Sequence, residues 1–159
     1  MQVYLAGPLF TPYERGYLSE VAAQIRAAGI DVFVPHEQEF AEPIDAEVVF
    51  QKDGIGLFPA NAVVALLDGP MVDDGTACEI GIFYGLKQHD ESKKGVVGLL
   101  TDTRFIGSHG HTIEGRGVNL FVLGCIEAMG VVTSSVNEVV EILAQWRDEL
   151  AGSHRGVRA

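Results

Sequence analysis

Four carboxylates fall within twelve residues of the chain, at Asp68, Asp73, Asp74 and Glu79. They follow an unbroken apolar run typical of a buried strand and precede a stretch with helical periodicity. If the helix begins near Thr76, Glu79 lies in its first turn. There the helix dipole favours an ionised carboxylate, the form that a nucleophile needs. The alternative is structural, with Thr76 and Glu79 as a capping box and the aspartates as turn or N-cap residues. Spacing alone favours this structural alternative.

Phosphate and dinucleotide chemistry have little support in the sequence. No GxGxxG follows the first apolar run, and no GxxxxGK[ST] occurs anywhere. The first loop, residues 7–12, contains two prolines and neither lysine nor arginine. Because a phosphate cradle needs amide donors and positive charge, a phosphorylated ligand is disfavoured at this loop.

Histidine and cysteine give weak support for metal or thiol chemistry. His36, His109 and His111 lie in expected loops at spacings typical of no metal site, so exposed loop positions explain them better. Cys78 and Cys125 each stand in an apolar helical stretch, where a free cysteine usually packs as a small hydrophobic side chain. We therefore expect neither a metal ion nor another cofactor.

Short apolar runs alternate with amphipathic stretches, which predicts strands that alternate with helices. We expect strands over residues 3–6, 31–35, 62–67, 96–100 and 131–132. We expect helices over residues 12–29, 45–58, 76–87, 118–128 and 135–150. This alternation is typical of the α/β class, here a doubly wound sheet of about five mainly parallel strands with helices on both faces.

The expected helix after residue 44 has a clear start and a weaker apolar face. Asp45 is placed to cap it, and Val48, Val49 and Ile55 recur at a spacing that puts them on one side. We expect these three side chains to face the core.

Ligands of such sheets bind outside the carboxyl ends of the strands, near the point where the strand order reverses. This rule selects residues 7–11, 68–76 and 101–117. The last of these segments is rich in glycine and is a candidate lid over a site. The carboxylates between residues 68 and 79 therefore lie where a ligand is expected.

Composition narrows the class of partner. The chain has 159 residues, 47% of them hydrophobic, and a formal net charge of −11. We expect one domain over residues 1–152 and a short tail over residues 153–159. The acidic balance disfavours nucleic acid polymers, which are bound by Lys and Arg.

No run approaches the roughly 20 apolar residues of a membrane span. With no basic leader and two isolated cysteines, we expect a cytoplasmic protein.

Four fragments, in order and at matching separations over about 120 residues, resemble the nucleoside 2-deoxyribosyltransferase family. They are Tyr-Leu-Ala-Gly-Pro-Leu-Phe at 4–10, Asp53, the stretch from Leu-Asp-Gly at 67–69 to Glu-Ile-Gly at 79–81, and Gly-Val-Asn-Leu-Phe at 117–121. The resemblance implies a flavodoxin-like domain that exchanges the base of a 2′-deoxynucleoside through a covalent deoxyribosyl-enzyme. With this resemblance, the interpretation of Glu79 as a nucleophile is favoured over its interpretation as a capping-box residue.

By position, the resemblance implies a role for each of five residues. Glu79 is the nucleophile that attacks C1′, and Tyr4 orients its carboxylate. Asp53 contacts the nucleobase and helps transfer a proton to and from its ring nitrogen. Asp73 binds the 5′-hydroxyl, joined by Asn119 from a neighbouring subunit. Because Glu79 must be ionised while Asp53 carries a proton, we expect their surroundings to separate the two pKa values.

The resemblance also implies substrate contacts and an assembly. It places Gly7, Phe10 and Phe121 among the substrate-binding residues, although the family often has Met at the position of Phe121. It implies a homo-oligomer built from dimers, typically a hexamer, in which Asn119 completes a neighbour's site. Purine 2′-deoxynucleosides and free bases are the implied substrates. Pyrimidines stay open, because the family contains purine-only and broader enzymes.

Two alternatives remain open. A 2′-deoxynucleoside 5′-monophosphate N-hydrolase would use the same Glu79, but it would need a phosphate site that the first loop lacks. A non-catalytic nucleoside-sensing module on the same fold would explain a pocket. It would not explain the joint presence of Tyr4, Asp53, Asp73 and Glu79.

Overall fold

Runs of β-branched and small apolar residues form five strands in the computed structural model, which describes residues 1–39, 42–103 and 118–153. The strands are β1 (Gln2–Ala6), β2 (Asp31–Phe33), β3 (Ala62–Leu66), β4 (Gly95–Leu99) and β5 (Val131–Thr133). They form one sheet in the order β2-β1-β3-β4-β5, and every pair is parallel. The predicted parallel sheet is confirmed, and its strand order is that of flavodoxin-like folds.

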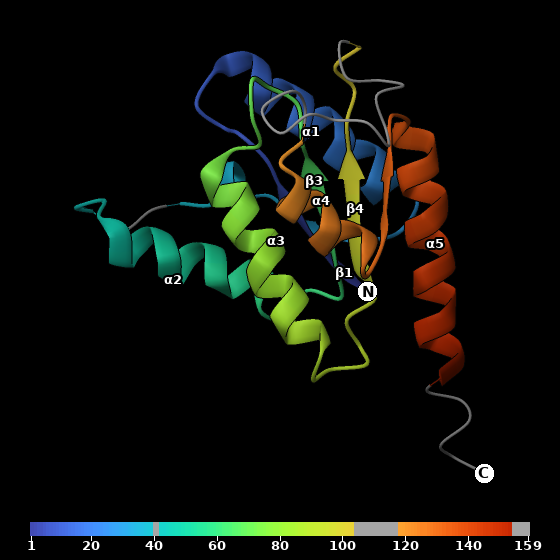
Figure 1. The fold of residues 1–159 in the computed structure, drawn as a ribbon. Coiled ribbons are helices and arrows are strands. Elements are labelled where there is room, and N and C mark those ends of the chain that lie inside the picture. The colour runs from blue at the N-terminus through green and yellow to red at the C-terminus, as the bar shows by residue number, and fades with distance from the viewer. Residues whose placement is uncertain (40–41, 104–117, 154–159) are drawn as a thin grey trace.

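Five α-helices and one short 3₁₀ helix connect these strands. They are α1 (Pro12–Ala27), η1 (Pro35–Glu37), α2 (Ala46–Leu57), α3 (Asp74–Lys87), α4 (Leu120–Glu127) and α5 (Val136–Ser153). Helices α1 and α5 pack on one face of the sheet, and α2, α3 and α4 lie on the other (Figure 1). The expected doubly wound arrangement, with helices on both faces, is therefore confirmed.

The central strands distribute their side chains to two separate cores. On β3, Val64 and Leu66 join the core under α1 and α5, whereas Val63 and Ala65 join the core under α2, α3 and α4. A strand buried on both faces needs no polar alternation, which accounts for its unbroken apolar run. Tyr4 of β1 belongs to the second core, so its side chain points toward α2 and α3.

Helix α2 buries small residues where large ones were expected. Asp45 does cap it, accepting a hydrogen bond from Val48 N at 2.9 Å. However, Ile55 is 70% exposed, and the expectation that it faces the core is wrong. The buried positions are Gly54, Gly56 and Leu57. A Cβ atom at Gly56 would lie 2.2 Å from the Phe33 ring, so the missing side chain allows α2 to approach β2 closely.

Helix α3 begins two residues earlier than predicted. Asp73 is its N-cap, and Oδ2 of Asp73 accepts hydrogen bonds from both N and Oγ1 of Thr76, at 3.0 and 3.2 Å. Thr76 therefore lies inside the first turn and is buried. The predicted capping box of Thr76 and Glu79 is wrong, because an aspartate at the true N-cap satisfies the amide of Thr76.

Some predicted segments fall outside the described residues. Residues 104–117 of the expected loop and residues 154–159 of the expected tail are among them. The start of the loop is described. There Asp68, after β3, accepts hydrogen bonds from the backbone N of Thr101 and Asp102, at 2.6 and 2.9 Å. In the described ranges, no helix combines the length and apolar character needed to cross a bilayer.

Candidate active site

A hydrogen bond joins the first strand to the third helix. The hydroxyl of Tyr4 donates to Oε1 of Glu79. Tyr4 is fully buried, and its ring stacks on Phe33 with centroids 5.6 Å apart and planes 14° apart. Phe33 in turn packs closely against Gly56 of α2, so the Tyr4 ring is fixed by packing. Burial, followed by the charge of Glu79, raises the pKa of Tyr4 far above its ordinary value, so the hydroxyl stays a donor.

Glu79 lies in the second turn of α3, six residues after the N-cap at Asp73. The prediction of a first-turn carboxylate close to the helix dipole is therefore wrong. Its pKa is raised to about 7, chiefly by burial, with smaller contributions from the negative charges of Asp53 and Asp73. The Tyr4 hydrogen bond and the charge of Lys52 act in the opposite direction. The protein holds Glu79 near the boundary between its protonated and ionised forms.

Asp53 approaches the same space from α2 and is half-buried. Burial raises its pKa, and the neighbouring charge of Lys52 lowers it. The ammonium of Lys52 lies 3.4 Å from Oδ1 of Asp53 and donates a hydrogen bond to the backbone oxygen of Pro35 at 3.2 Å. Two carboxyl groups of raised pKa thus face one cavity. Among the residues that the structure describes, Asp53 has a cation at ion-pair distance and Glu79 has none.

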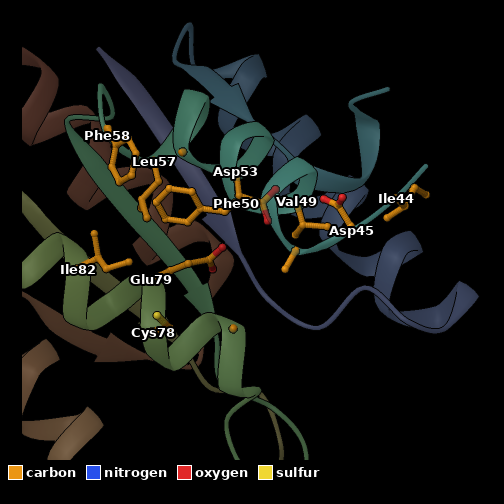
Figure 2. A pocket seen from close by; sticks show the side chains of 13 residues that line it. Ile44, Asp45, Val49, Phe50, Asp53, Leu57, Phe58, Cys78, Glu79 and Ile82 are labelled. Atoms are coloured by element: carbon orange, nitrogen blue, oxygen red, sulfur yellow. The ribbon is translucent and has the colours of Figure 1, made fainter. Parts of the chain in front are cut away.

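Two adjoining hollows share Val49, Asp53, Gly75 and Glu79 in their walls. The first, of about 300 Å³, is called the polar hollow because five charged side chains line it. It is completed by Gly7, Leu9, Phe10, Pro35, Lys52, Asp73, Asp74 and Thr76. The second, of about 520 Å³, is apolar and opens between α2 and α3. Figure 2 shows the carboxyl groups of Asp53 and Glu79 directed into this space from the two helices. The carboxyl groups of Asp53 and Glu79 lie in the wall that the two hollows share.

The structure gathers most of the predicted site residues at these hollows. Gly7, Phe10 and Asp73 line the polar hollow together with Asp53 and Glu79. Phe10 is nonetheless 73% exposed, so its ring forms an open rim. The carboxylate of Asp73 both lines the hollow and caps α3.

Asn119 and Phe121 lie elsewhere in the chain's own fold. Oδ1 of Asn119 caps α4 by accepting hydrogen bonds from the backbone N of Phe121 and Val122, at 2.9 and 3.3 Å. Phe121 is 82% exposed. Neither residue is among those that line the two hollows. A contribution from either to a site on another copy of the chain stays a prediction.

Lys52 is the residue that sequence reasoning missed. A lysine directly before Asp53 carries no distinctive signal, because adjacent helix side chains normally point about 100° apart. Only the fold shows that the long lysine side chain reaches back over the same cavity. Among the described residues, no group of three or more His, Cys, Asp or Glu side chains is arranged to hold a metal ion.

This arrangement suits the displacement of a leaving group at carbon. Glu79 offers a carboxylate oxygen held in one orientation by Tyr4, as a nucleophile requires. Asp53 offers a second carboxyl group across the cavity that can give or take a proton. Two carboxyl groups in these roles are typical of retaining glycosidic chemistry.

Comparisons with known proteins identify the family and the fold. A model of the nucleoside 2-deoxyribosyltransferase family matches residues 3–123. An uncharacterized protein of Ureaplasma parvum serovar 3 is 30% identical over 137 residues, covering 79% of this chain and 83% of that protein. The crystal structure of a conserved protein from Enterococcus faecalis V583 is 30% identical with a TM-score of 0.76, covering 91% and 98% of the two chains. A 2-deoxyribosyltransferase from Bacillus psychrosaccharolyticus shares the fold, at 24% identity and a TM-score of 0.63, covering 88% and 90%.

Proposed function

The chain belongs to the nucleoside 2-deoxyribosyltransferase family, and we propose that it exchanges the nucleobase of a 2′-deoxynucleoside for another free base. The observation that carries the proposal is the Tyr4–Glu79 hydrogen bond at the wall of a cavity that also contains Asp53. Family membership supports a glycosyl-transfer enzyme in general. The buried, oriented carboxylate supports a covalent route in particular.

In the first half-reaction, an oxygen of ionised Glu79 attacks C1′ of the deoxyribose. The C1′–N bond to the base breaks as a C1′–O bond to Glu79 forms. The electron pair of the broken bond stays on the base nitrogen, which takes a proton from the carboxyl group of Asp53. The products are a deoxyribosyl ester of Glu79, a neutral free base and ionised Asp53. Stabilising the charge that develops at C1′ and protonating the base lower the barrier together.

The second half-reaction reverses these steps with a different base. The incoming base gives its ring proton to Asp53 and attacks C1′, so the ester bond to Glu79 breaks. Asp73 lines the polar hollow and supplies an acceptor for the 5′-hydroxyl of the sugar. The apolar hollow has Phe50, Phe58 and Ile82 in its wall, and we expect a base bound there to keep water away from the carboxyl pair. Excluding water favours transfer over hydrolysis.

The remaining parts of the proposal rest on family likeness. We expect purine 2′-deoxynucleosides and free bases as substrates, a cytoplasmic location and a homo-oligomer built from dimers, typically a hexamer. In that assembly Asn119 reaches a neighbour's site, and Gly7, Phe10 and Phe121 contact substrate.

One incubation tests the function directly. Deoxyinosine and adenine are mixed with the protein in buffer without phosphate or added metal, and the products are separated by chromatography. We expect deoxyadenosine and hypoxanthine in equal amounts. Free deoxyribose as the sole sugar product would instead identify a hydrolase. Absence of turnover with any 2′-deoxynucleoside or its 5′-monophosphate would point to a sensing module.

The covalent step has a separate test. Acid quenching during turnover, followed by proteolysis and mass spectrometry, should find a deoxyribosyl group on the peptide that contains Glu79. The Glu79→Ala variant serves as the control and should show neither adduct nor exchange. Exchange by that variant would contradict the assignment of the nucleophile.

A further inference from the structure

Lys52 and the residue that follows it, Asp53, direct their side chains to the same hollow. Its side chain is only 10% exposed, and its ammonium lies 3.4 Å from Oδ1 of Asp53. The same ammonium donates a hydrogen bond to the backbone oxygen of Pro35, which fixes it against η1. Both side chains line the polar hollow with Glu79, although consecutive helix residues normally diverge. The lysine is therefore held inside the site by two separate contacts.

The charges around this hollow are strongly unequal. Within the part of the chain that the structure describes, Lys52 is the one basic side chain that lines it, against the four carboxylates Asp53, Asp73, Asp74 and Glu79. The neighbouring elements add no charge to this wall. Strand β1 places the neutral hydroxyl of Tyr4 on Glu79, the loop after β1 contributes uncharged residues, and η1 contributes Pro35. His36 of η1 is not among the lining residues, and its pKa is lowered chiefly by burial. Lys52 is the counter-charge of the site.

We propose that Lys52 is a positioning residue for the exchange reaction, whose ammonium holds Oδ1 of Asp53 and leaves Oδ2 to exchange a proton with the nucleobase. The inference rests on the proposed function and adds to it a residue that touches Asp53 rather than the substrate. Lys52 fixes the orientation of Asp53, and it keeps that carboxyl group from holding its proton too tightly.

The chemistry of exchange explains why such a residue is needed. Asp53 gives a proton to the departing base and must accept one from the entering base. Both its protonated and its ionised form must therefore be accessible. Burial alone raises the pKa of Asp53 and favours the protonated form. The adjacent ammonium favours the ionised form and offsets that effect. Without it, the proton would leave Asp53 too slowly in the first half-reaction.

Three substitutions separate this role from a structural one. Lys52→Met removes the charge and the hydrogen bond to Pro35, whereas Lys52→Gln removes the charge but keeps an N–H donor. Lys52→Arg keeps the charge. Lys87→Met is the matched control, because Lys87 is also part-buried and donates to a backbone oxygen, that of Lys93 at 2.9 Å, away from both hollows.

The first measurement does not depend on activity. Carboxyl ¹³C chemical shifts of Asp53 are followed by NMR as pH is varied in each folded variant. We expect the pKa of Asp53 to rise by about one pH unit or more in Lys52→Met and Lys52→Gln, and to stay near the wild-type value in Lys52→Arg and Lys87→Met. If Lys52→Met does not fold, Lys52→Gln decides. An unchanged Asp53 pKa in the uncharged variant overturns the inference.

The second measurement uses base exchange between deoxyinosine and adenine. We expect kcat to fall at least tenfold in both uncharged variants, with KM for deoxyinosine nearly unchanged, and Lys52→Arg to recover most of the loss. The fall in kcat at low pH should also move to higher pH, because the charge of Lys52 lowers the pKa of both Asp53 and Glu79. An unchanged kcat and pH profile would overturn the inference and leave the proposed function intact. Wild-type protein that exchanges no base, but whose Asp53 titrates as expected, would instead overturn the function and leave the Lys52–Asp53 coupling.

Discussion

The hydroxyl of Tyr4 donates a hydrogen bond to Oε1 of Glu79, although 75 residues separate the two along the chain. Strand β1 and helix α3 meet on the face of the sheet that α2 also covers, and that meeting creates the contact. The bond favours ionised Glu79, whereas burial favours the protonated form. The balance places the pKa of Glu79 at about 7.

Removing the hydroxyl of Tyr4 should shift that balance. In Tyr4→Phe, the pKa of Glu79 should rise above about 7, so less of the enzyme carries an ionised nucleophile at neutral pH. We expect kcat/KM to fall at pH 7 and its acid limb to move to higher pH, because the reaction needs ionised Glu79. The control is Tyr17→Phe, which removes a hydroxyl that interacts with Thr101. Equal pH profiles for Tyr4→Phe and wild type would contradict the role of Tyr4.

Glu79 should make stability depend on pH. Its pKa of about 7 in the folded chain exceeds the ordinary value of 4.5, so the folded state keeps the proton longer. The free energy of unfolding should therefore decrease as pH rises from about 4.5 to 7. In Glu79→Gln, which carries no charge, this loss is absent. Relative to wild type, we expect a gain of about 3 kcal/mol at pH 8 that largely vanishes at pH 4, measured by urea unfolding. A gain independent of pH would argue against a buried ionisable Glu79.

Asp73 should affect both stability and substrate binding. Asp73→Ala removes the N-cap of α3 and should cost about 1 kcal/mol. It also removes the proposed partner of the 5′-hydroxyl, so KM for deoxyinosine should rise by tenfold or more. Thr11→Ala removes the N-cap of α1 at a similar cost without facing either hollow. A KM change of equal size in both variants would show that Asp73 acts through helix stability alone.

A methyl group at Gly56 should disturb the site without touching substrate. The added Cβ would lie 2.2 Å from the Phe33 ring, which stacks on Tyr4. Either α2, with Asp53, moves outward or the rings shift beneath Glu79. We expect Gly56→Ala to lose about 1–3 kcal/mol of stability and most of its kcat, measured at a temperature where it is fully folded. Gly16→Ala, where a Cβ has open space, is the control. Full activity in folded Gly56→Ala would contradict this coupling.

Mixing an impaired variant with an inactive one tests whether Asn119 acts on a neighbouring chain. Asn119→Ala should lower kcat/KM for exchange, and Glu79→Ala should abolish it. If Asn119 completes a neighbour's site, oligomers refolded from both variants contain some sites with an intact Glu79 and an intact Asn119. We expect such mixtures to regain activity beyond the sum of the separate variants. Absence of regain in demonstrated mixed oligomers would confine Asn119 to its own chain.

The sequence was most informative where one physical signal dominated. The unbroken apolar run of β3 predicts a strand buried on both faces, and the structure confirms it. Helix α2 was harder, because its close approach to β2 uses Gly56, which carries no apolar signal. A search for large apolar residues therefore chose exposed Ile55 instead.

The candidate site likewise contains features that the sequence predicts and features that depend on tertiary packing. Family likeness assigns Tyr4, Asp53 and Glu79 to one site. In the structure Tyr4 donates a hydrogen bond to Glu79, which lines one cavity together with Asp53. The electrostatic setting of Glu79 was not predictable, because its pKa depends on burial by α2 and β1 rather than on its distance from a helix end. Lys52 was missed for a related reason. Its reach to Pro35 depends on how α2 lies against η1, a tertiary property that adjacent residues do not encode.

The strand order has an evolutionary consequence. Tyr4, Lys52, Asp53, Asp73 and Glu79 all precede Lys87, so the first three βα units carry every group assigned to bond breaking within one copy of the chain. Strands β4 and β5, with α4 and α5, extend the sheet away from β1 on the far side of β3. Substitutions at exposed positions after residue 87 can therefore accumulate with little disturbance to the reacting groups, whereas Val96 and Ile126 share a core with Tyr4. Natural selection can retune substrate preference and subunit association in the second half of the gene while the first half keeps the chemistry.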